Sequence, residues 1–564
     1  MKRLAVSLFV VAMLVSSLAA CATPTPEVEV IEREVEREVT REVEVEVEVT
    51  VPPEPERELT ERERTLIFTY PFEPANMDPH QYFEAEWNMP FNAVYEYMFI
   101  YRGSEAEFTP QLVESYEVSA DGMTYTFNLR EGVKFHSGED FNAETFKWNM
   151  DRLVDLGRAA RFIANYVENI EIVDDYTVAF ELMEATPGYH LMLAGNWAPK
   201  FVCPQAVEDN RTEDDPWADE WFQNNMCGTG PYQFVSYEPG QRLVIERFED
   251  YWGGWGDKHF DRMIQRIVPE SSTQRLLLET GEIDLTCMPL ELEDIKALQE
   301  TEGITCRADP SSLIHIISLK SVDAGETGPM MSNEKVRQAL AYAFNYEGAV
   351  EDIMGIKGDR ISDMLYLDAF EGHDPDHYVY TYDLERAREL LAEAGYPDGG
   401  FELELLWLEG FPDYPPIAEM YQADLAKLGI DLTVRGLPPG TFSERRMSPE
   451  TTADVWLRPR ASSNPLGYDW IVGWTESAFP PARINEGYWS DPEFEELYAK
   501  AVVELDDEQR AEYVRQAAAI ASESVPVIWI ASVNDVMCYR DSVKGQVHSP
   551  FYMYVYWPYD LYRQ

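Results

Sequence analysis

The sequence predicts a mixed α/β fold for the globular part of the chain, which begins near residue 65. Apolar residues alternate at Tyr125, Phe127 and Leu129, a pattern typical of a half-buried strand. The helix-like segment Ile417–Leu428 is followed at once by the strand-like Ile430–Val434, which indicates layered βα units. The remaining length of about 500 residues predicts two or three domains that share large cores.

Three helices carry clear start signals. Asn142 precedes a segment with apolar residues at helical spacing, and Asn333 precedes another of the same kind. Asp383 precedes a third segment, which Gly395 is expected to end. These residues predict helices that begin immediately after each of the three caps.

The N-terminus has the form of an export signal. Lys2 and Arg3 precede the apolar stretch Leu4–Leu18, which is too short and too early to be a membrane span between folded parts. Leu18-Ala19-Ala20-Cys21 resembles the lipobox of bacterial lipoproteins, in which the cysteine is lipidated. We expect residues 1–21 to be a lipoprotein signal that ends at a lipidated Cys21, with cleavage leaving Cys21 as the first residue. The lipid would hold the chain at a membrane surface without spanning it. An ordinary signal with an unrelated cysteine is the alternative.

Residues 22–64 are expected to form a tether. Valine and glutamate alternate strictly over Glu42–Glu48, and Pro52, Pro53 and Pro55 follow. Alternation is a strand pattern, but here one face would carry a row of like charges. The sequence therefore favours an extended, solvated spacer, with a coiled or paired stalk as the alternative.

The charge of the chain excludes some partners. Acidic residues outnumber basic ones by 103 to 45, giving a formal net charge of −58. Such a protein repels nucleic acid and anionic lipid headgroups, so we expect neither as a ligand. No apolar run after the signal is long enough to cross a bilayer.

Signatures of catalysis and cofactor binding are missing from the sequence. It holds no GxSxG, HExxH, Walker A or strand-following GxGxxG pattern. His373, Asp374, Asp376 and His377 form one cluster of ligand-type residues, but Pro375 interrupts it and favours a polar loop. We therefore expect no enzyme activity, no cofactor and no metal site.

Five cysteines follow Cys21, and an exported protein can form disulfides. Cys203 and Cys227 flank a short polar loop, whereas Cys287 and Cys306 end two strand-like segments. We expect either pair to be able to form a bridge, which would leave Cys538 free.

A set of ordered motifs resembles the family 5 extracellular solute-binding proteins, the peptide- and nickel-type binding components of ABC importers. The similar segments cover the body from about residue 65: Met77–His80, Leu112–Arg130 with Gly132–Gly138, Gly228–Tyr232, Val336–Leu340, Asp383–Pro397, Tyr488–Leu497 and Val525–Val527. Each motif alone is a weak signal, and their order along the chain is the strong one.

This resemblance implies a two-lobe, periplasmic-binding-protein-like fold of type II, cluster C, with a domain inserted in the first lobe. It implies a first lobe of residues 65–95, 226–312 and 533–564, an insert of 96–225 and a second lobe of 313–532. The crossings between lobes are expected near 308–316 and 527–537. Family membership also implies an extracytoplasmic, monomeric protein that binds a small-molecule or peptide ligand by hinge closure and delivers it to ABC permease and ATPase subunits.

The resemblance places ligand contacts on two segments. From the first lobe these are Tyr82, Phe83, Glu84 and Trp87, with a purely structural role for Phe83 and Trp87 as the alternative. From the second lobe they are Trp456, Arg458, Arg460, Asp469, Trp470 and Trp474. Peptide-binding relatives carry an amine-binding aspartate where this chain has Ala461 or Ser462, if Asn464-Pro465 corresponds to the family's closing Asp-Pro.

That departure puts recognition of a free peptide N-terminus in question. An oligopeptide is the ligand that we expect, because most relatives with this architecture carry peptides. An oligosaccharide stacked on the tryptophan rings is the alternative within the family. Outside the family, two alternatives stay open. A surface-anchored hydrolase would need a nucleophile–base pair or paired carboxylates in a cleft, and an adhesin would show no ligand-dependent stabilisation.

Overall fold

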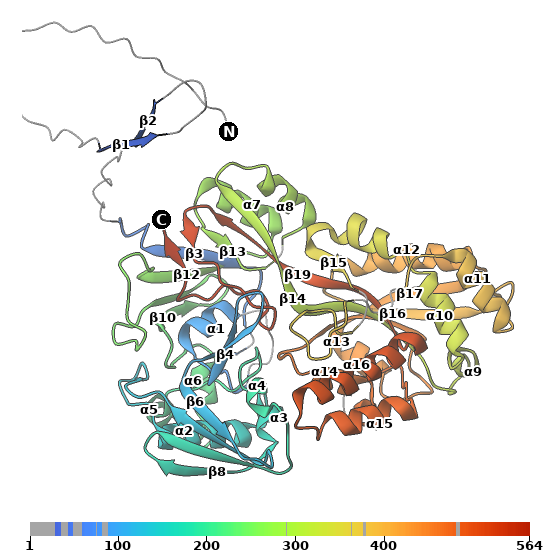
Figure 1. Ribbon diagram of the computed structural model, residues 1–564, viewed down its shortest axis with the longest axis horizontal. Coiled ribbons are helices and arrows are strands. Elements are labelled where there is room, and N and C mark those ends of the chain that lie inside the picture. The colour runs from blue at the N-terminus through green and yellow to red at the C-terminus, as the bar shows by residue number, and fades with distance from the viewer. Residues whose placement is uncertain are drawn as a thin grey trace, which may run out of the picture. The chain divides into compact units, whose positions relative to one another are not determined.

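The computed structural model describes residues 59–74, 76–81, 88–288, 290–361, 364–375, 380–480 and 485–564, together with the backbone of 29–34 and 43–48. The chain forms two compact units, Met1–Thr60 and Glu61–Gln564 (Figure 1). Cys21 and most of the tether lie outside the described residues, as does the export signal.

The first unit contains a pair of strands. β1 (Glu29–Glu34) and β2 (Val43–Glu48) pair antiparallel, with Val30 opposite Val47. The segment expected to form the tether therefore contains one antiparallel strand pair. Valine is a strong strand former, and its regular alternation supplies the pattern that an antiparallel pair requires.

The second unit is built on one large sheet (Figure 1). Its strands lie in the order β10 (Tyr232–Glu238), β11 (Arg242–Arg247), β12 (Arg262–Ile267), β3 (Thr65–Tyr70), β13 (Leu285–Thr286), β19 (Val527–Arg540), β14 (Ile304–Leu319), β18 (Val455–Ala461), β16 (Glu402–Leu408) and β17 (Asp431–Leu437), and β15 (Gly358–Arg360) pairs with β19. Strands β12 and β3 are parallel, as are β16 and β17, whereas the two central strands are antiparallel. The α/β expectation is therefore met.

The two central strands, β14 and β19, pass through both halves of this sheet (Figure 1). They pair from Ile304 opposite Arg540 to Ser318 opposite Val527, and the register shifts between Pro310 and Ile314. Proline lacks a backbone N–H and is typical of bulges. The segments 308–316 and 527–537, expected to connect the lobes, lie within these two strands.

Residues 113–182 add a separate antiparallel sheet. Its order is β6 (Val113–Val118), β7 (Thr124–Leu129), β9 (Thr177–Leu182) and β8 (Val167–Asp174). Helix α2 (Ala143–Leu156) follows β7, and the Asn142 side chain accepts a hydrogen bond from the Thr145 backbone N–H at 3.0 Å. Phe127 and Phe146 belong to the same buried cluster as Leu66 of the large sheet. The core therefore continues from one sheet to the other.

The other two predicted helix caps are also present. Asn333 accepts from Lys335 N at 3.0 Å and starts α10 (Glu334–Tyr342). Asp383 accepts from Arg386 N at 2.9 Å and starts α11 (Leu384–Glu393), after which Gly395 has a φ of +97°. Helix α12 (Tyr414–Ala426) precedes β17 as the sequence predicts.

The remaining elements complete the two halves. The helices are α1 (Asn88–Val94), α3 (Arg161–Ala164), α4 (Tyr189–Met192), α5 (Pro204–Asn210), α6 (Asp219–Phe222), α7 (Ser271–Thr280), α8 (Leu292–Gln299), α9 (Gly328–Met331), α13 (Pro439–Arg445), α14 (Gly467–Ile471), α15 (Pro492–Ala501) and α16 (Asp507–Ser524). Two short pairs are formed by β4 (Phe99–Arg102) with β5 (Glu107–Pro110) and by β20 (Val543–Lys544) with β21 (Tyr562–Arg563).

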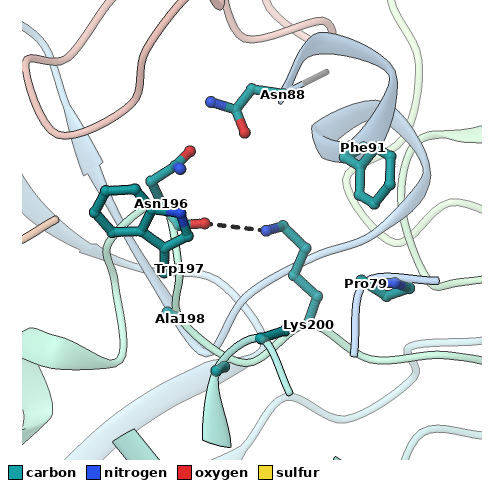
Figure 2. A pocket seen from close by; sticks show the side chains of 9 residues that line it. Pro79, Asn88, Phe91, Asn196, Trp197, Ala198 and Lys200 are labelled. Carbon is teal, nitrogen blue, oxygen red and sulfur yellow. Dashed lines mark hydrogen bonds between the residues drawn. The ribbon is translucent and has the colours of Figure 1, made fainter. Parts of the chain in front are cut away.

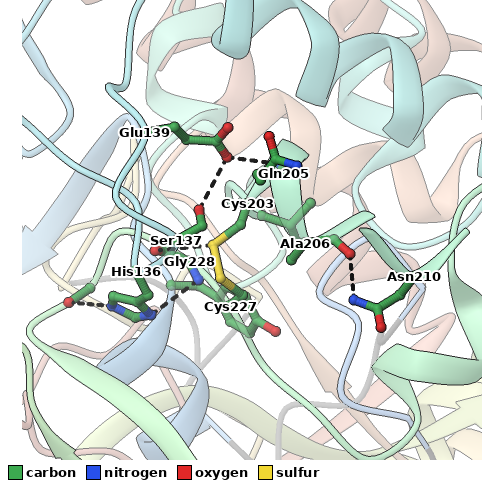
Figure 3. The surroundings of a disulfide bond; sticks show 12 residues. His136, Ser137, Glu139, Cys203, Gln205, Ala206, Asn210, Cys227 and Gly228 are labelled. Carbon is green, nitrogen blue, oxygen red and sulfur yellow. Dashed lines mark hydrogen bonds between the residues drawn. A yellow bond between two sulfur atoms is a disulfide. The ribbon is translucent and has the colours of Figure 1, made fainter. Parts of the chain in front are cut away.

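One expected disulfide is present and the other is replaced. Cys203 and Cys227 are bonded, with their Cα atoms 5.4 Å apart (Figure 3). Cys306 is bonded to Cys538 and not to Cys287, because β14 and β19 place Cys306 and Cys538 directly opposite each other. Cys287 is a free, buried thiol.

The first disulfide lies where two of the sequence motifs meet (Figure 3). The Nδ1 atom of His136, from the Gly132–Gly138 motif, accepts from Gly228 N at 3.3 Å, and its Nε2 atom lies 2.8 Å from Gly230 O. Burial lowers the pKa of His136 to about 4, so the ring is neutral at physiological pH. These motif residues therefore hold the fold together.

Candidate functional site

A buried ion pair fixes the chain just before the predicted first-lobe ligand segment. Both guanidinium Nη atoms of Arg152 contact Asp78, at 3.0 and 2.6 Å, and both side chains are 0% exposed. Burial opposes ionisation of Asp78, but the charge and hydrogen bonds of Arg152 outweigh it and keep the Asp78 pKa below its usual value. The Met77–His80 motif therefore serves as an anchor.

The segment that follows this anchor was predicted to contact the ligand. Tyr82, Phe83, Glu84 and Trp87 lie outside the described residues. The chain is described again at Asn88, whose Nδ2 atom donates to Met553 O at 2.7 Å. Asn88 is therefore held to the C-terminal part of the chain.

The predicted second-lobe wall begins on β18. Trp456 is 0% exposed, packs against Phe442 with ring centroids 4.7 Å apart, and donates from Nε1 to Thr452 Oγ1 at 3.0 Å. Arg458 forms an ion pair of 3.0 Å with Glu486, which is also fully buried. The Trp456 ring is therefore enclosed by protein, and the charge of Arg458 is balanced from within the lobe.

Arg460 lies between two of the predicted tryptophans. Its guanidinium carbon is 3.6 Å from the Trp474 ring centroid and 4.7 Å from that of Trp470, close enough for cation–π attraction. A Cβ atom on Gly473 would lie 1.6 Å from Arg460 Nη2, so only glycine leaves room for this arrangement. Trp474 also packs against Trp529 of β19 at 5.3 Å. The structure thus brings Arg460, Trp470 and Trp474 into one buried cluster.

Asp469 differs from the rest of the second-lobe wall because it is partly exposed. It lies on α14, and its Oδ2 atom accepts a hydrogen bond from Asn464 Nδ2 at 2.9 Å. The Asn464 Oδ1 atom accepts from Leu466 N at 3.0 Å, so both ends of this amide are used. Asn464 therefore orients the carboxylate of Asp469.

The segment predicted to form the second-lobe wall is in contact with residues of the predicted insert, 96–225. The Tyr468 hydroxyl donates to Pro187 O at 2.6 Å. An ideal Cβ on Gly195 would lie 1.7 Å from Ser463 O, so the two backbones touch at this point. Asp469 and Asn464 are thus next to the surface where the second-lobe wall meets the insert.

The sequence of residues 107–477 matches the family model described as "Bacterial extracellular solute-binding proteins, family 5 Middle". The chain belongs to this family. The family predicted from the ordered motifs is therefore confirmed. The matched residues make up well more than half of the chain.

Named relatives of this family 5 protein cover most of its length. It is 29% identical to a glutathione-binding protein GsiB of Pectobacterium atrosepticum, over 75% of this chain and 79% of that protein. It is 26% identical to the heme-binding protein A of Haemophilus influenzae, over 86% of this chain and 90% of that one.

Solved structures confirm the two-lobe fold. HbpA2 from Haemophilus parasuis has a TM-score of 0.75 and 25% identity, over 89% of this chain and all of that one. DppA from Helicobacter pylori, in complex with the peptide STSA, has a TM-score of 0.73 and 23% identity, over 88% and 98% of the two chains.

The family 5 protein shows no metal centre in the part that is described. No group of three His, Cys, Asp or Glu side chains in those residues is arranged to hold an ion. Asp376 and His377 of the predicted polar loop lie outside the described residues, and His373 Nε2 is 3.2 Å from Asp368 Oδ1. The described helices also include none that is long and apolar enough to cross a membrane.

Sequence reasoning missed a buried cation that lies beside Pro79 and Asn88. Lys200 is 9% exposed, and burial lowers its pKa to about 7. It lines a cavity with Asn196, Asn88 and Trp197 (Figure 2). A single lysine without a recognisable spacing partner gives no signal in the sequence.

Proposed function

We propose that this family 5 protein is the extracytoplasmic binding component of an ABC importer and that its solute is a peptide-class compound with a free amino group. The observation that carries the ligand class is the position of Asp469. It is a partly exposed carboxylate, oriented by Asn464, beside the contact between the second lobe and the insert. An ammonium group is the natural partner of such a carboxylate.

The neighbouring residues of the second-lobe wall support this choice. The charge of Arg458 is balanced by Glu486, and Arg460 is covered by two indole rings. The Trp470 and Trp474 rings are 3% exposed and pack on each other, which leaves little ring face for a sugar. The oligosaccharide alternative therefore has weaker support than a peptide.

The names of similar proteins agree with a peptide-class solute. They include the glutathione-binding protein of Pectobacterium atrosepticum and the Helicobacter pylori protein in complex with peptide STSA. Another structure is a dipeptide-binding protein from Pseudoalteromonas in complex with Met-Leu, with a TM-score of 0.73 and 22% identity. The same set also contains heme- and nickel-binding proteins, so a direct identification of the solute is the decisive experiment.

Capture of the solute is proposed to occur by hinge closure around β14 and β19. These are the two strands that cross between the halves of the sheet, and their register shift at Pro310 interrupts regular pairing. A ligand held by groups from both lobes stabilises the closed state more than the open one. In this scheme the described residues bind the solute without transforming it.

Delivery is proposed to take place at a membrane surface. Lipidation of Cys21 would hold the mature protein there, and residues 22–64 would join the anchor to the binding unit. The bound solute would then pass to permease and ATPase subunits. We propose that the binding unit acts as a monomer.

The first experiment identifies the solute. Native mass spectrometry of the purified mature protein should show a bound mass that fragments into amino acids. A retained hexose series or heme would contradict the peptide proposal.

The second experiment tests Asp469 by calorimetry with that solute. Asp469→Asn should weaken binding at least about tenfold, because a charge pair in a closed site is lost. Acetylation of the solute's amino group should weaken wild-type binding and leave Asp469→Asn unaffected. Asp431→Asn, at an exposed position of β17, is the matched control. Equal affinities of wild type and Asp469→Asn would contradict the role of this carboxylate.

A further inference from the structure

The ammonium group of Lys200 is buried with few partners. Its Nζ atom donates to Asn196 O at 3.1 Å and lies 4.5 Å from the centroid of the Tyr97 ring. Among the described residues, no carboxylate lies within ion-pair distance of this atom. An ammonium has three N–H donors, so the protein itself leaves part of this capacity unused. Burial without a counter-charge is the reason for the lowered pKa of Lys200.

A second polar group next to Lys200 has no partner among the described residues. Asn196 is 2% exposed, and neither its Oδ1 nor its Nδ2 atom makes a hydrogen bond there. Buried polar groups are almost always hydrogen-bonded, so an unpartnered amide indicates a missing occupant. Figure 2 shows this amide and the Lys200 ammonium on the same cavity.

The cavity itself is small and mostly apolar. Apart from Asn196, Lys200 and Asn88, it is lined by Pro79, Phe91, Ala159, Ala160, Trp197 and Ala198. Its volume is about 10 Å³, close to what one water molecule or one oxygen atom of a carboxylate requires. In an apolar wall the attraction between unlike charges is stronger than in water.

We infer that this cavity is a binding site for one small, singly charged anionic group of the carboxylate or halide kind, held by the Lys200 ammonium and the Asn196 amide. The ammonium would supply the charge and its unused donors. The amide NH₂ of Asn196 would donate the second hydrogen bond. An anion would accept hydrogen bonds from both the ammonium and the Asn196 Nδ2 atom, whereas a water molecule would leave the ammonium without a counter-charge.

Two sources of this anionic group agree with the geometry. It is either a free ion from solution or the carboxylate of the transported solute. Gly195, which precedes Asn196 directly, touches Ser463 of the second-lobe wall. The cavity is therefore close to the contact between insert and second lobe, where a solute end can approach it. The solute-carboxylate source rests on the proposed function, and the free-ion source does not.

The first measurement needs only the wild-type protein. Its thermal unfolding midpoint is followed in formate and in chloride, with ionic strength held constant by a sulfonate too large for the cavity. We expect a saturable rise at about pH 6 that is weaker at about pH 8.5, because Lys200 loses its charge between them. His80, Tyr97 and Asp78 keep their state over this range, since the pKa of His80 is lowered to about 4, that of Tyr97 is raised and that of Asp78 is lowered. Glu96, which precedes Tyr97, has a pKa raised to about 7, so the comparison is repeated in Glu96→Gln.

The second measurement compares variants and solute forms. Lys200→Met and Asn196→Ala should remove the saturable rise, and Lys134→Met, an exposed lysine of the same insert, should retain it. In calorimetry, amidation of a peptide's carboxyl group should weaken wild-type binding at least about tenfold if the solute supplies the anion. The same change should then have no effect on Lys200→Met.

The outcomes separate the two sources from failure. A free ion is supported if formate raises the unfolding midpoint and amidation weakens peptide binding equally in wild type and Lys200→Met. The solute carboxylate is supported if amidation weakens peptide binding only in the wild type. A wild type that binds no peptide contradicts the proposed function, and the formate measurement still decides the site. Absence of both effects in the wild type means that the cavity holds only water and overturns the inference.

Discussion

Replacing Arg152 by methionine should strongly destabilise the second unit. Methionine keeps much of the apolar stem but removes the guanidinium, which contacts Asp78 twice, Trp217 O at 2.9 Å and His80 Nδ1 at 3.0 Å. Asp78 would remain fully buried as an uncompensated carboxylate. Removing one member of a buried pair typically costs about 3–5 kcal/mol of unfolding free energy. We expect a loss in this range.

The pH dependence of this loss has a definite sign. In the wild type the pKa of Asp78 is lowered, so its stabilising effect is present above the unfolded-state pKa and is lost as the pH falls through the folded-state value. Without Arg152, burial is expected to raise the Asp78 pKa. As the pH falls, protonation of Asp78 therefore removes the buried charge that destabilises the variant. The difference between wild type and Arg152→Met should therefore shrink in acid.

Equilibrium urea unfolding, followed by tryptophan fluorescence, measures these differences. Arg211→Met, which breaks an exposed pair with Glu208, is the control and should cost about 1 kcal/mol or less. Adding Asp78→Asn to Arg152→Met should recover part of the loss, since the buried charge is gone. A loss below about 1 kcal/mol for Arg152→Met would refute the view that Met77–His80 is an anchor.

Three further outcomes follow from other groups. Reducing or replacing the Cys306–Cys538 bond, which spans 232 residues, should cost about 5.5 kcal/mol by the chain-entropy estimate, measured by urea unfolding of the double serine variant. Burial raises the pKa of Glu96 to about 7, so wild-type stability relative to Glu96→Gln should fall by about 3 kcal/mol as the pH rises from about 4.5 to beyond 7; a flat difference would contradict this. Cys21→Ser should release the protein from the membrane fraction, and unchanged fractionation would contradict lipid anchoring.

The parts of the fold that depend on neighbours in sequence could be predicted from it. Asn142, Asn333 and Asp383 each accept a hydrogen bond from a backbone N–H two or three residues ahead, so their effect is set by local chain geometry. The Cys203–Cys227 bridge likewise closes a short segment. In contrast, the partner of Cys306 depends on the register of two strands far apart in sequence, which no local pattern contains.

The candidate site was only partly predictable for a related reason. Trp456, Arg458 and Arg460 alternate along β18 and so lie on one face of it, but the sequence does not say what covers that face. In the structure α13 contributes Phe442 to cover Trp456, and Glu486 neutralises Arg458. The sequence identifies side chains that could bind a ligand, whereas tertiary packing decides which of them stay partly exposed.

A test of closure joins the two proposed charge sites. Asp469 lies in the predicted second lobe and would bind an ammonium, whereas Lys200 lies in the predicted insert of the first lobe and would bind a carboxylate. A zwitterionic peptide held at both ends would bridge the lobes only in the closed state, so its binding energy would favour closure. A peptide blocked at either end keeps one of the two contacts and should bind with little closure. Small-angle scattering should therefore show a smaller radius of gyration with the unblocked peptide than with either blocked form. An equal radius of gyration with all three peptides would show that closure does not depend on contacts with Asp469 and Lys200.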